Sequence, residues 1–168
     1  MNYNREIGEA KIDLDTAKNR ALAFLEGNGY KNMKESYYTI QDNIVTINFA
    51  YMQSGVICYT DLIKVKVALD NGDILGMESK GYLNSHVERN IEEPKITLDE
   101  ARNIINPKME ILSEGLAIVP TDWSTEVLCY EFKGKVEENN FIVYVDANTG
   151  REQDVFMIVD SENGQLAI

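Results

Sequence analysis

The chain of 168 residues carries 44% hydrophobic and 26% charged side chains, a composition that excludes a disordered chain and suits one domain or two small ones. A formal net charge of -12 and a pI of ≈ 4.5 exclude a nucleic-acid partner over most of the surface, because a phosphate backbone would be repelled. No apolar run approaches the ~20 residues that span a bilayer, and no signal peptide follows Met1, so we expect a soluble chain.

An amphipathic helix is predicted from about Leu14 to Glu26. Its apolar residues recur at helical spacing on one face: Leu14, Ala17, Ala21, Phe24 and Leu25. Asp13 is the expected N-cap, and the Gly27-Asn28-Gly29 sequence is expected to end the helix.

Strands are predicted after this helix at residues 33–40, 44–51, 56–69 and 74–83. Val45, Ile47, Phe49 and Tyr51 alternate along the second strand, as a half-buried strand requires. Asn71-Gly72 is the strongest hairpin signal, because a type I′ turn needs positive φ at both central residues.

A polar stretch from Asn84 to Pro94 is the expected joint before a second, similar run of elements. Thr97 and Glu100 predict a capping box at a helix start, and Pro107 is expected to cut that helix short. Strands are predicted after it at residues 109–119, 125–133, 141–147 and 155–160.

An internal repeat organises the whole chain. The segment Lys11 to Lys18 is echoed by Lys95 to Arg102 at an offset of 84 (101 − 17). We therefore predict an α+β fold of two tandem units, residues 1–88 and 89–168, each with a helix packed on a mostly antiparallel four-stranded sheet. Pairing the turn residues Asp70 and Asp146 gives an offset of 76, so the second unit would be eight residues shorter between helix and turn.

Nothing in the sequence specifies an active site. His86 is the only histidine, with no acid or nucleophile pattern near it in the sequence. Asp70, Asn71 and Asp73 resemble half of a calcium loop but lack its closing glutamate, and a hairpin turn explains the same residue types. We therefore predict no catalytic residue, no metal site and no cofactor.

The two cysteines, Cys58 and Cys129, have neither a CxxC spacing nor equivalent places in the repeat. We expect two buried, hydrophobic thiols, and a disulfide between them stays open as an alternative.

The tyrosines on predicted strands are the candidates for a protein-binding surface, because a sheet covered by a helix on one face leaves its other face free. The candidate residues are Tyr37, Tyr38, Tyr51, Tyr59 and Tyr82. Ordinary core packing is an equally good interpretation of each tyrosine taken singly.

A helix beginning with a Leu-Asp-x-Ala pattern, followed by strands that lead to Asp-Asn-Gly at residues 70–72, resembles the PepSY domain. The longer strings at residues 29–33, 47–51, 59–72, 80–83 and 127–134 resemble the YpeB family of spore germination proteins over nearly the whole chain.

The YpeB resemblance implies a non-enzymatic module that keeps the cortex-lytic hydrolase SleB present and stable in the spore, outside the inner membrane. It also implies a membrane anchor in an N-terminal part that has no counterpart here, while this fragment itself would make no membrane contact. Because PepSY domains are proposed to restrain proteases, protease inhibition is the alternative function.

Overall fold

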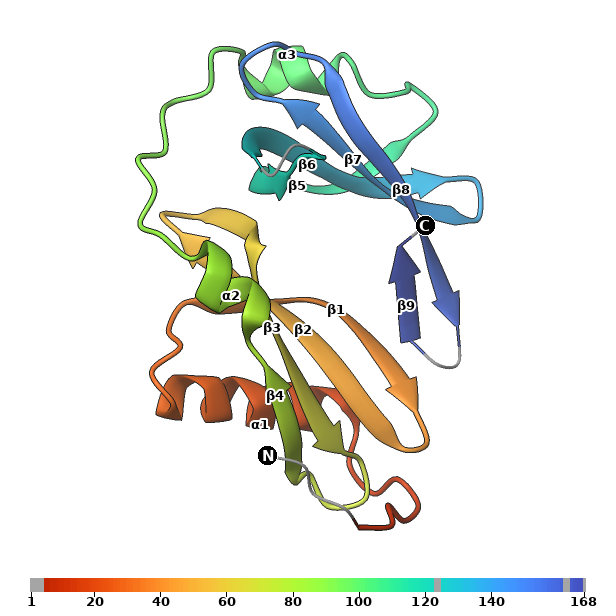
Figure 1. Cartoon of the computed structure of the whole chain (residues 1–168). Coiled ribbons are helices and arrows are strands. Elements are labelled where there is room, and N and C mark those ends of the chain that lie inside the picture. The colour runs from red at the N-terminus through yellow and green to blue at the C-terminus, as the bar shows by residue number, and fades with distance from the viewer. Residues whose placement is uncertain (1–4, 123–124, 162–163, 168) are drawn as a thin grey trace. The chain divides into compact units, whose positions relative to one another are not determined.

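The structure, a computed structural model, describes residues 5–122, 125–161 and 164–167. These residues form the helices α1 (Leu14–Gly27), α2 (Lys80–Ser85) and α3 (Leu98–Arg102) and the strands β1 (Met33–Gln41), β2 (Ile44–Gln53), β3 (Val56–Ala68), β4 (Ile74–Glu78), β5 (Glu110–Pro120), β6 (Glu126–Val136), β7 (Asn139–Asp146), β8 (Glu152–Ser161) and β9 (Gly164–Ala167). Figure 1 shows these elements along the chain.

The described residues fold into two compact units. Unit 1 consists of the described residues within the ranges 1–52, 61–86 and 160–166. Unit 2 consists of the described residues within the ranges 53–60, 87–159 and 167–168. Strand β3 therefore begins in unit 2 and continues into unit 1. The predicted mixture of a few helices with many strands is confirmed, with nine strands among the described residues. The prediction of four strands in each unit is not confirmed, and the repeat boundary between residues 88 and 89 stays a prediction.

In unit 1, α1 packs its apolar stripe against an antiparallel sheet. Ala17, Ala21 and Leu25 of the helix are fully buried and join the side chains of β2 and β3 in one core. The predicted N-cap is confirmed, because the Thr16 N–H donates to the Asp13 carboxylate over 2.8 Å. The ladders run from β4 through β3 and β2 to β1, and Thr39 of β1 also pairs with Gly164 of β9.

The type I′ geometry lies in a different turn from the predicted one. Asp42 and Asn43, between β1 and β2, take φ values of 52° and 58°, as both central residues of that turn must. In the hairpin between β3 and β4 only Gly72 has positive φ, and its N–H donates to the Ala68 carbonyl over 2.8 Å. The hairpin prediction at Asn71-Gly72 is correct, but the turn is wider than type I′.

The strand predicted for residues 74–83 ends at Glu78, and the chain then forms α2. The helix lies close to β3, since a Cβ on Gly81 would come within 3.0 Å of the Leu62 carbonyl oxygen. Glycine at this position lets the two backbones approach, which a residue with a side chain would hinder.

In unit 2 the helix is much shorter. The capping box at α3 is confirmed, because Glu100 N–H donates to Thr97 Oγ1 and Thr97 N–H donates to the Glu100 carboxylate. The helix ends at Arg102, before Pro107, as the sequence predicts. Strand β5 pairs with β6, β6 with β7 and β7 with β8, each time antiparallel. The start of β3 pairs with β5 in parallel.

Backbone hydrogen bonds repeat in the two units. Lys11 N–H and Ile12 N–H donate to the Leu69 carbonyl, and Lys95 N–H and Ile96 N–H donate in the same way to the Ala147 carbonyl. The offset at the turn is therefore 78 (147 − 69) and not 76, so Asp70 corresponds to Asn148 and the sequence pairing of Asp70 with Asp146 is wrong. The second unit is six residues shorter (84 − 78) between helix and turn.

Candidate functional site

The structure places the five candidate tyrosines in four different surroundings, described by unit. Tyr51 and Tyr82 come together in unit 1. Tyr37 is exposed on β1, while its neighbour Tyr38 packs on the core with the Lys18 ammonium 5.6 Å from its ring centre. Tyr59 belongs to unit 2.

An aromatic cluster around His86 is the most developed side-chain arrangement in unit 1. The Tyr82 ring stacks on the His86 ring with centres 4.1 Å apart, and the Tyr51 ring meets His86 edge-on at 4.6 Å. Tyr30, just after α1, contacts Tyr82 edge-on at 5.2 Å. These rings fix α2 against β2 and the end of α1.

A buried carboxylate lies behind this cluster. Asp61 of β3 is fully buried, and its Oδ2 lies 2.8 Å from His86 Nδ1. This pairing is not visible in the sequence, because Asp61 and His86 are 25 positions apart. The carboxylate orients the imidazole, as the carboxylate of a hydrolase triad does, but the same contact also suits a structural histidine that gives a buried acid its hydrogen-bond partner.

Burial raises the pKa of the Tyr82 hydroxyl, and the nearby Tyr51 and Asp61 raise it further. The phenol therefore stays protonated at neutral pH and is a hydrogen-bond donor without negative charge. The site is therefore an apolar environment, lined by aromatic rings, that holds one imidazole–carboxylate pair.

Unit 2 contains a second buried acid, Glu131 of β6. Tyr59 and Tyr144 both donate their hydroxyl hydrogens to its Oε2, over 2.6 and 2.9 Å. Lys133 Nζ lies 3.2 Å from the other oxygen, Oε1. Burial raises the pKa of Tyr144 well above its ordinary range, and Glu131 adds to the effect. Tyr59 is thus held by an internal hydrogen bond.

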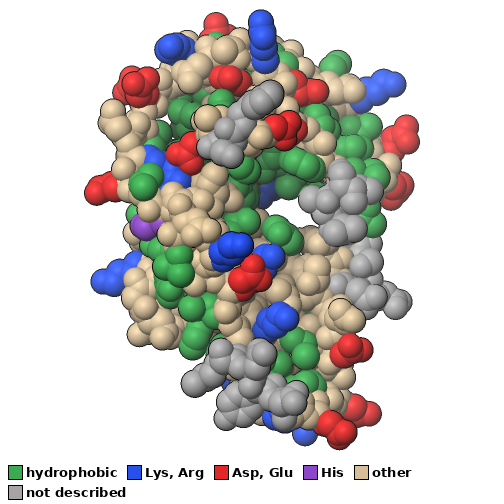
Figure 2. All heavy atoms as spheres, viewed as in Figure 1, with side chains coloured by type: hydrophobic (Ala, Val, Ile, Leu, Met, Phe, Trp, Pro, Cys, Tyr) green, Lys and Arg blue, Asp and Glu red, His purple; other side chains and the backbone are tan. Residues whose placement is uncertain are grey.

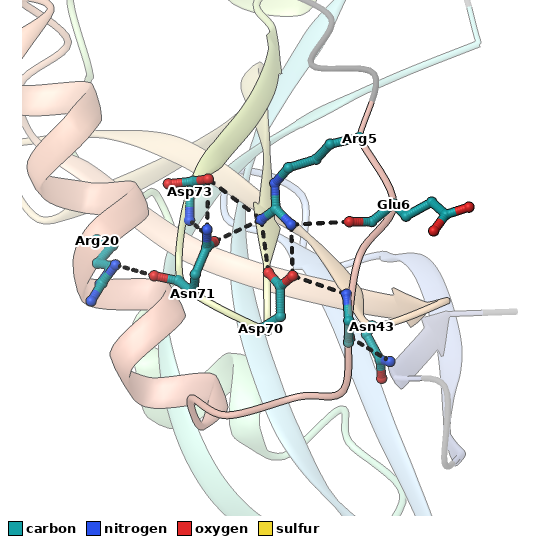
Figure 3. Close-up of polar contacts among 8 residues, drawn as sticks. Arg5, Glu6, Arg20, Asn43, Asp70, Asn71 and Asp73 are labelled. Carbon is teal, nitrogen blue, oxygen red and sulfur yellow. Dashed lines mark hydrogen bonds and ion pairs between the residues drawn. The ribbon is translucent and has the colours of Figure 1, made fainter.

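The turn between β3 and β4 carries a polar cluster, at the residues for which the sequence offered half of a calcium loop or a hairpin turn (Figure 3). Arg5 donates to both oxygens of Asp70 over 2.6 and 2.8 Å and to Asn71 Oδ1 over 2.8 Å. Asp73 Oδ2 lies 3.4 Å from the same guanidinium. Arg5 therefore already binds the side-chain oxygens that resemble calcium ligands in the sequence.

A corresponding arginine precedes the second unit's helix. Arg89 follows Arg5 by the repeat offset of 84 (89 − 5), and its side chain is only 6% exposed. It donates to Glu126 over 2.7 and 3.0 Å and to Thr60 Oγ1 over 2.8 Å. The segment that the sequence predicts to be a simple linker between the two units thus contains a buried, hydrogen-bonded arginine. The recurrence of Arg-x-Ile-x-Glu-x-Lys-Ile at residues 5–12 and 89–96 is the sequence signal that identifies it.

Among the described residues, no group of three or more His, Cys, Asp or Glu side chains is arranged to hold a metal ion. In the same part of the chain, no helix combines the length and the apolar character needed to cross a membrane. Cys58 and Cys129 are both buried and unbonded to each other.

Comparison with known proteins gives the family. The profile of the family described as "YpeB sporulation, PepSY1 and PepSY2 domains" matches residues 1–92, more than half of the 168 residues. The chain belongs to the YpeB family. A second profile, "Peptidase propeptide and YPEB domain", matches residues 95–156.

Two curated relatives are each called "Sporulation protein YpeB". That of Halalkalibacterium halodurans is 40% identical over 158 residues, 94% of this chain and 35% of the relative. That of Bacillus subtilis is 34% identical over 161 residues, 95% of this chain and 36% of the relative. The chain thus spans about a third of the length of these YpeB proteins.

A solved structure, the "Bacillus megaterium YpeB C-terminal domain", matches with a TM-score of 0.85 and 32% identity. The match covers 93% of this chain and 70% of that one. The fold described above is therefore that of a YpeB C-terminal region.

Proposed function

We propose that this chain is a non-catalytic, protein-binding module of a sporulation protein, which keeps a cortex-lytic hydrolase of the SleB kind stable in the spore. The observation that carries the proposal is the match of 94% and 95% of the chain to proteins called sporulation protein YpeB. We also propose that the module consists of two related PepSY-like units and acts outside the inner membrane.

The pairing of three acids inside the fold supports a non-catalytic module. The buried Asp61 is held by His86, the buried Glu131 by two tyrosine hydroxyls, and the partly buried Asp70 by Arg5. Each carboxylate therefore has a hydrogen-bond partner within the fold. A hydrolase would need an acid, a base or a nucleophile that is free to act on a substrate.

A binding and digestion experiment tests the proposal. The purified chain is expected to retain the hydrolase in a pull-down, to lengthen the hydrolase's lifetime under limited proteolysis, and to release no fragments from cortex peptidoglycan by itself. Cleavage of peptidoglycan that is lost in His86→Gln would overturn the non-catalytic function, because this substitution removes the imidazole of the Asp61–His86 pair. Failure to retain the hydrolase would overturn the proposal that the hydrolase is the binding partner.

The same pull-down tests the tyrosine surface. Tyr37 has 39% of its surface exposed, so Tyr37→Ala removes an available ring without opening the core. Tyr59→Phe is the control, since it removes a hydroxyl that is bound to Glu131 inside unit 2. Weaker retention by Tyr37→Ala alone would support the predicted surface, and equal retention by both variants would count against it.

Protease inhibition is the second candidate, favoured by the match of residues 95–156 to a peptidase propeptide domain. An inhibitor slows a protease acting on an unrelated substrate in proportion to the amount of inhibitor. A module that shields its bound partner leaves the hydrolysis of an unrelated substrate unchanged. Titrating the chain against a protease with such a substrate separates the two functions.

A further inference from the structure

One dipeptide that can react with its own backbone, Asn-Gly, recurs along the chain. It stands at residues 28–29, 71–72 and 163–164, and the asparagine of the third pair lies outside the described residues. Glycine has no side chain to shield its backbone nitrogen, which can therefore approach the side-chain amide of the asparagine before it. The two described pairs have the same local chemistry and differ in what the fold places around them.

The reaction open to such a pair is an intramolecular displacement. The glycine backbone nitrogen attacks the asparagine Cγ, a new C–N bond closes a five-membered succinimide ring, and the Cγ–Nδ2 bond breaks. The proton of the glycine N–H passes through solvent to the amide nitrogen, which leaves as ammonia. One water molecule then opens the ring at either carbonyl and gives aspartate or isoaspartate. The net reaction consumes water and releases ammonia, so it needs no oxidant, reductant or cofactor.

The fold fixes the reacting amide of Asn71 at both of its ends (Figure 3). Asn71 Oδ1 accepts hydrogen bonds from Arg5 over 2.8 Å and from the Asp73 N–H over 2.9 Å. Asn71 Nδ2 donates to Asp73 Oδ2 over 2.7 Å. The amide cannot turn toward the backbone nitrogen of the next residue unless these bonds break.

The attacking nitrogen of the same pair is also held. Gly72 is buried, and its N–H donates to the Ala68 carbonyl over 2.8 Å. Arg20 packs so closely on Gly72 that a Cβ there would overlap the guanidinium, and it donates to the Asn71 carbonyl over 2.6 Å. Ring closure at Asn71 thus requires several hydrogen bonds to break together, and each of them adds to the barrier.

The pair at Asn28 and Gly29 follows the C-terminal end of α1 and is held by fewer contacts. Both residues are exposed. Asn28 Nδ2 donates to the Phe24 carbonyl over 2.7 Å, and the Gly29 N–H donates to a carbonyl of the last helical turn over 3.1 Å. Helix ends fray, so these two bonds open without unfolding of the core. Within the described part of the chain, no group donates a hydrogen bond to Asn28 Oδ1.

We propose that Asn28 is a deamidation site of this protein, and that the Arg5 cluster protects the matching pair at Asn71. The Arg5 cluster consists of Arg5, Asp70, Asn71 and Asp73. The reaction belongs to the chain itself and needs only water, so it goes beyond the proposed function and does not depend on the identity of the partner.

Conversion of Asn28 weakens the helix that covers the core of unit 1. The Asn28 amide donates to a carbonyl at the helix end, which a carboxylate cannot do. A negative charge is unfavourable at the C-terminal end of a helix, and the last turn of α1 has no basic residue to offset it. The new charge also adds to a net charge of -12, and acidic side chains already lie across the face that Figure 2 shows.

Peptide mapping follows both pairs in one sample. Trypsin cleaves after lysine and arginine, so it places Asn28 in the fragment of residues 21–31 and Asn71 in that of residues 67–80. The third pair falls in the fragment of residues 152–168 and is recorded separately. The folded chain is kept at neutral pH for several weeks, and mass spectrometry gives the fraction of each fragment in which an acid has replaced the amide.

Asn28 is expected to react at least about tenfold faster than Asn71 in the folded chain, because fewer hydrogen bonds must break. In urea the two rates should become similar, since glycine follows both asparagines. The proposal is overturned if the ratio of the two rates is no larger in the folded chain than in urea.

Two variants test the protection by the Arg5 cluster. Arg5→Met removes the guanidinium from Asn71 Oδ1, and Asp73→Ala frees Asn71 Nδ2. Each is expected to speed the reaction of Asn71 at least about threefold and to leave the rate of Asn28 unchanged. Lys108→Gln, at an exposed position outside the cluster, is the control and should change neither rate. If neither variant speeds Asn71, or if both rates rise together, the cluster does not protect the pair and the proposal fails.

The consequence for α1 is measured with a variant that has the product's charge. Asn28→Asp is expected to lower the urea midpoint further than Asn28→Ala, because both lose the capping amide and only the first adds a negative charge at the helix end. Equal midpoints would contradict the predicted weakening of α1 by the new charge.

Discussion

Asp70 is the centre of the polar contacts in the turn between β3 and β4. Its carboxylate accepts hydrogen bonds from the Arg5 guanidinium and from the Gly8 N–H, which lies 2.9 Å away. The Arg5 hydrogen bond, and then the Gly8 one, hold the pKa of Asp70 well below its ordinary value of 3.8. A carboxylate with a lowered folded-state pKa stabilises the fold above its unfolded pKa and loses that effect as the pH falls below it.

Asp70→Asn is therefore expected to lower the urea midpoint at pH 7, and the gap to the parent chain should narrow as the pH falls through 3.8. Urea unfolding at a series of pH values measures both effects. Glu9→Gln, at an exposed position near the same segment, should leave the midpoint unchanged at every pH. A gap that stays constant down to acid pH would show that the Arg5 pair does not stabilise the fold.

The two thiols differ from reactive cysteines in their surroundings. Cys58 pairs in register with Ile118 and Cys129 pairs with Ala117, and consecutive residues of a strand point to opposite faces. Both thiols are fully buried, so a disulfide between them would need a rearranged sheet. Burial, followed by Asp146 and Asp154, raises the pKa of the Cys129 thiol to about 12.

We expect neither thiol to react with a disulfide reagent such as DTNB at pH 8 in the folded chain, and both to react after unfolding in urea. The thiolate is the reacting species, and burial removes both the thiolate and the access to it. Absorbance at the reagent's product band gives the number of thiols that react. A fast reaction of one equivalent without urea would contradict the buried environment.

Among the elements, α2 shows what the sequence could not predict. The sequence from Ile74 to Leu83 locally favours a strand. Residues from Lys80 onward nevertheless form a helix, because Tyr82 packs between Tyr30 and Tyr51. Those rings come from elements far away in the sequence. By contrast, α1 and the capping box of α3 were predictable, because their caps and apolar spacing lie within a few residues.

The candidate site follows the same rule. Tyrosines were recognisable by type, but their partners depend on strand register, which one sequence does not show. Asp61 and His86 are 25 positions apart, and Tyr59 and Glu131 are 72 apart. Strand β9 was missed because it has only 4 residues and pairs with β1.

The contribution of α2 can be measured through its ring contacts. Tyr82→Ala should reduce the free energy of unfolding by about 2 kcal/mol, since it removes a partly buried ring that contacts three others. Tyr82→Phe keeps the ring and should cost little. Urea unfolding gives the free energies, and the near-ultraviolet circular dichroism should weaken in Tyr82→Ala. Equal stability of the two variants would show that α2 is held by its backbone alone.

At the scale of the whole molecule, the two units differ in the length of their first helix and in their net charge. Unit 1 has the helix of 14 residues, and its ranges 1–52, 61–86 and 160–166 hold 13 Asp and Glu against 9 Lys and Arg, a net charge of -4. Unit 2 has a helix of only 5 residues, and its ranges 53–60, 87–159 and 167–168 hold 15 Asp and Glu against 7 Lys and Arg, a net charge of -8. Net charge of one sign destabilises a compact state through self-repulsion, whereas balanced charges form attractive pairs such as Arg5 with Asp70.

The two units should therefore respond to salt in opposite directions. Raising NaCl from about 10 mM to about 300 mM shortens the screening length from about 30 Å to below 10 Å. Screening should increase the hydrogen-exchange protection of β6 and β7, where it relieves repulsion, and should decrease that of α1 and β2, where it weakens attraction. Asp70→Asn should reduce the salt response of unit 1 and leave that of unit 2 unchanged. If all four elements respond to salt in the same direction, the unequal charge of the two units has no effect on stability. Sodium chloride is used because sulfate stabilises folded states by being excluded from the protein surface.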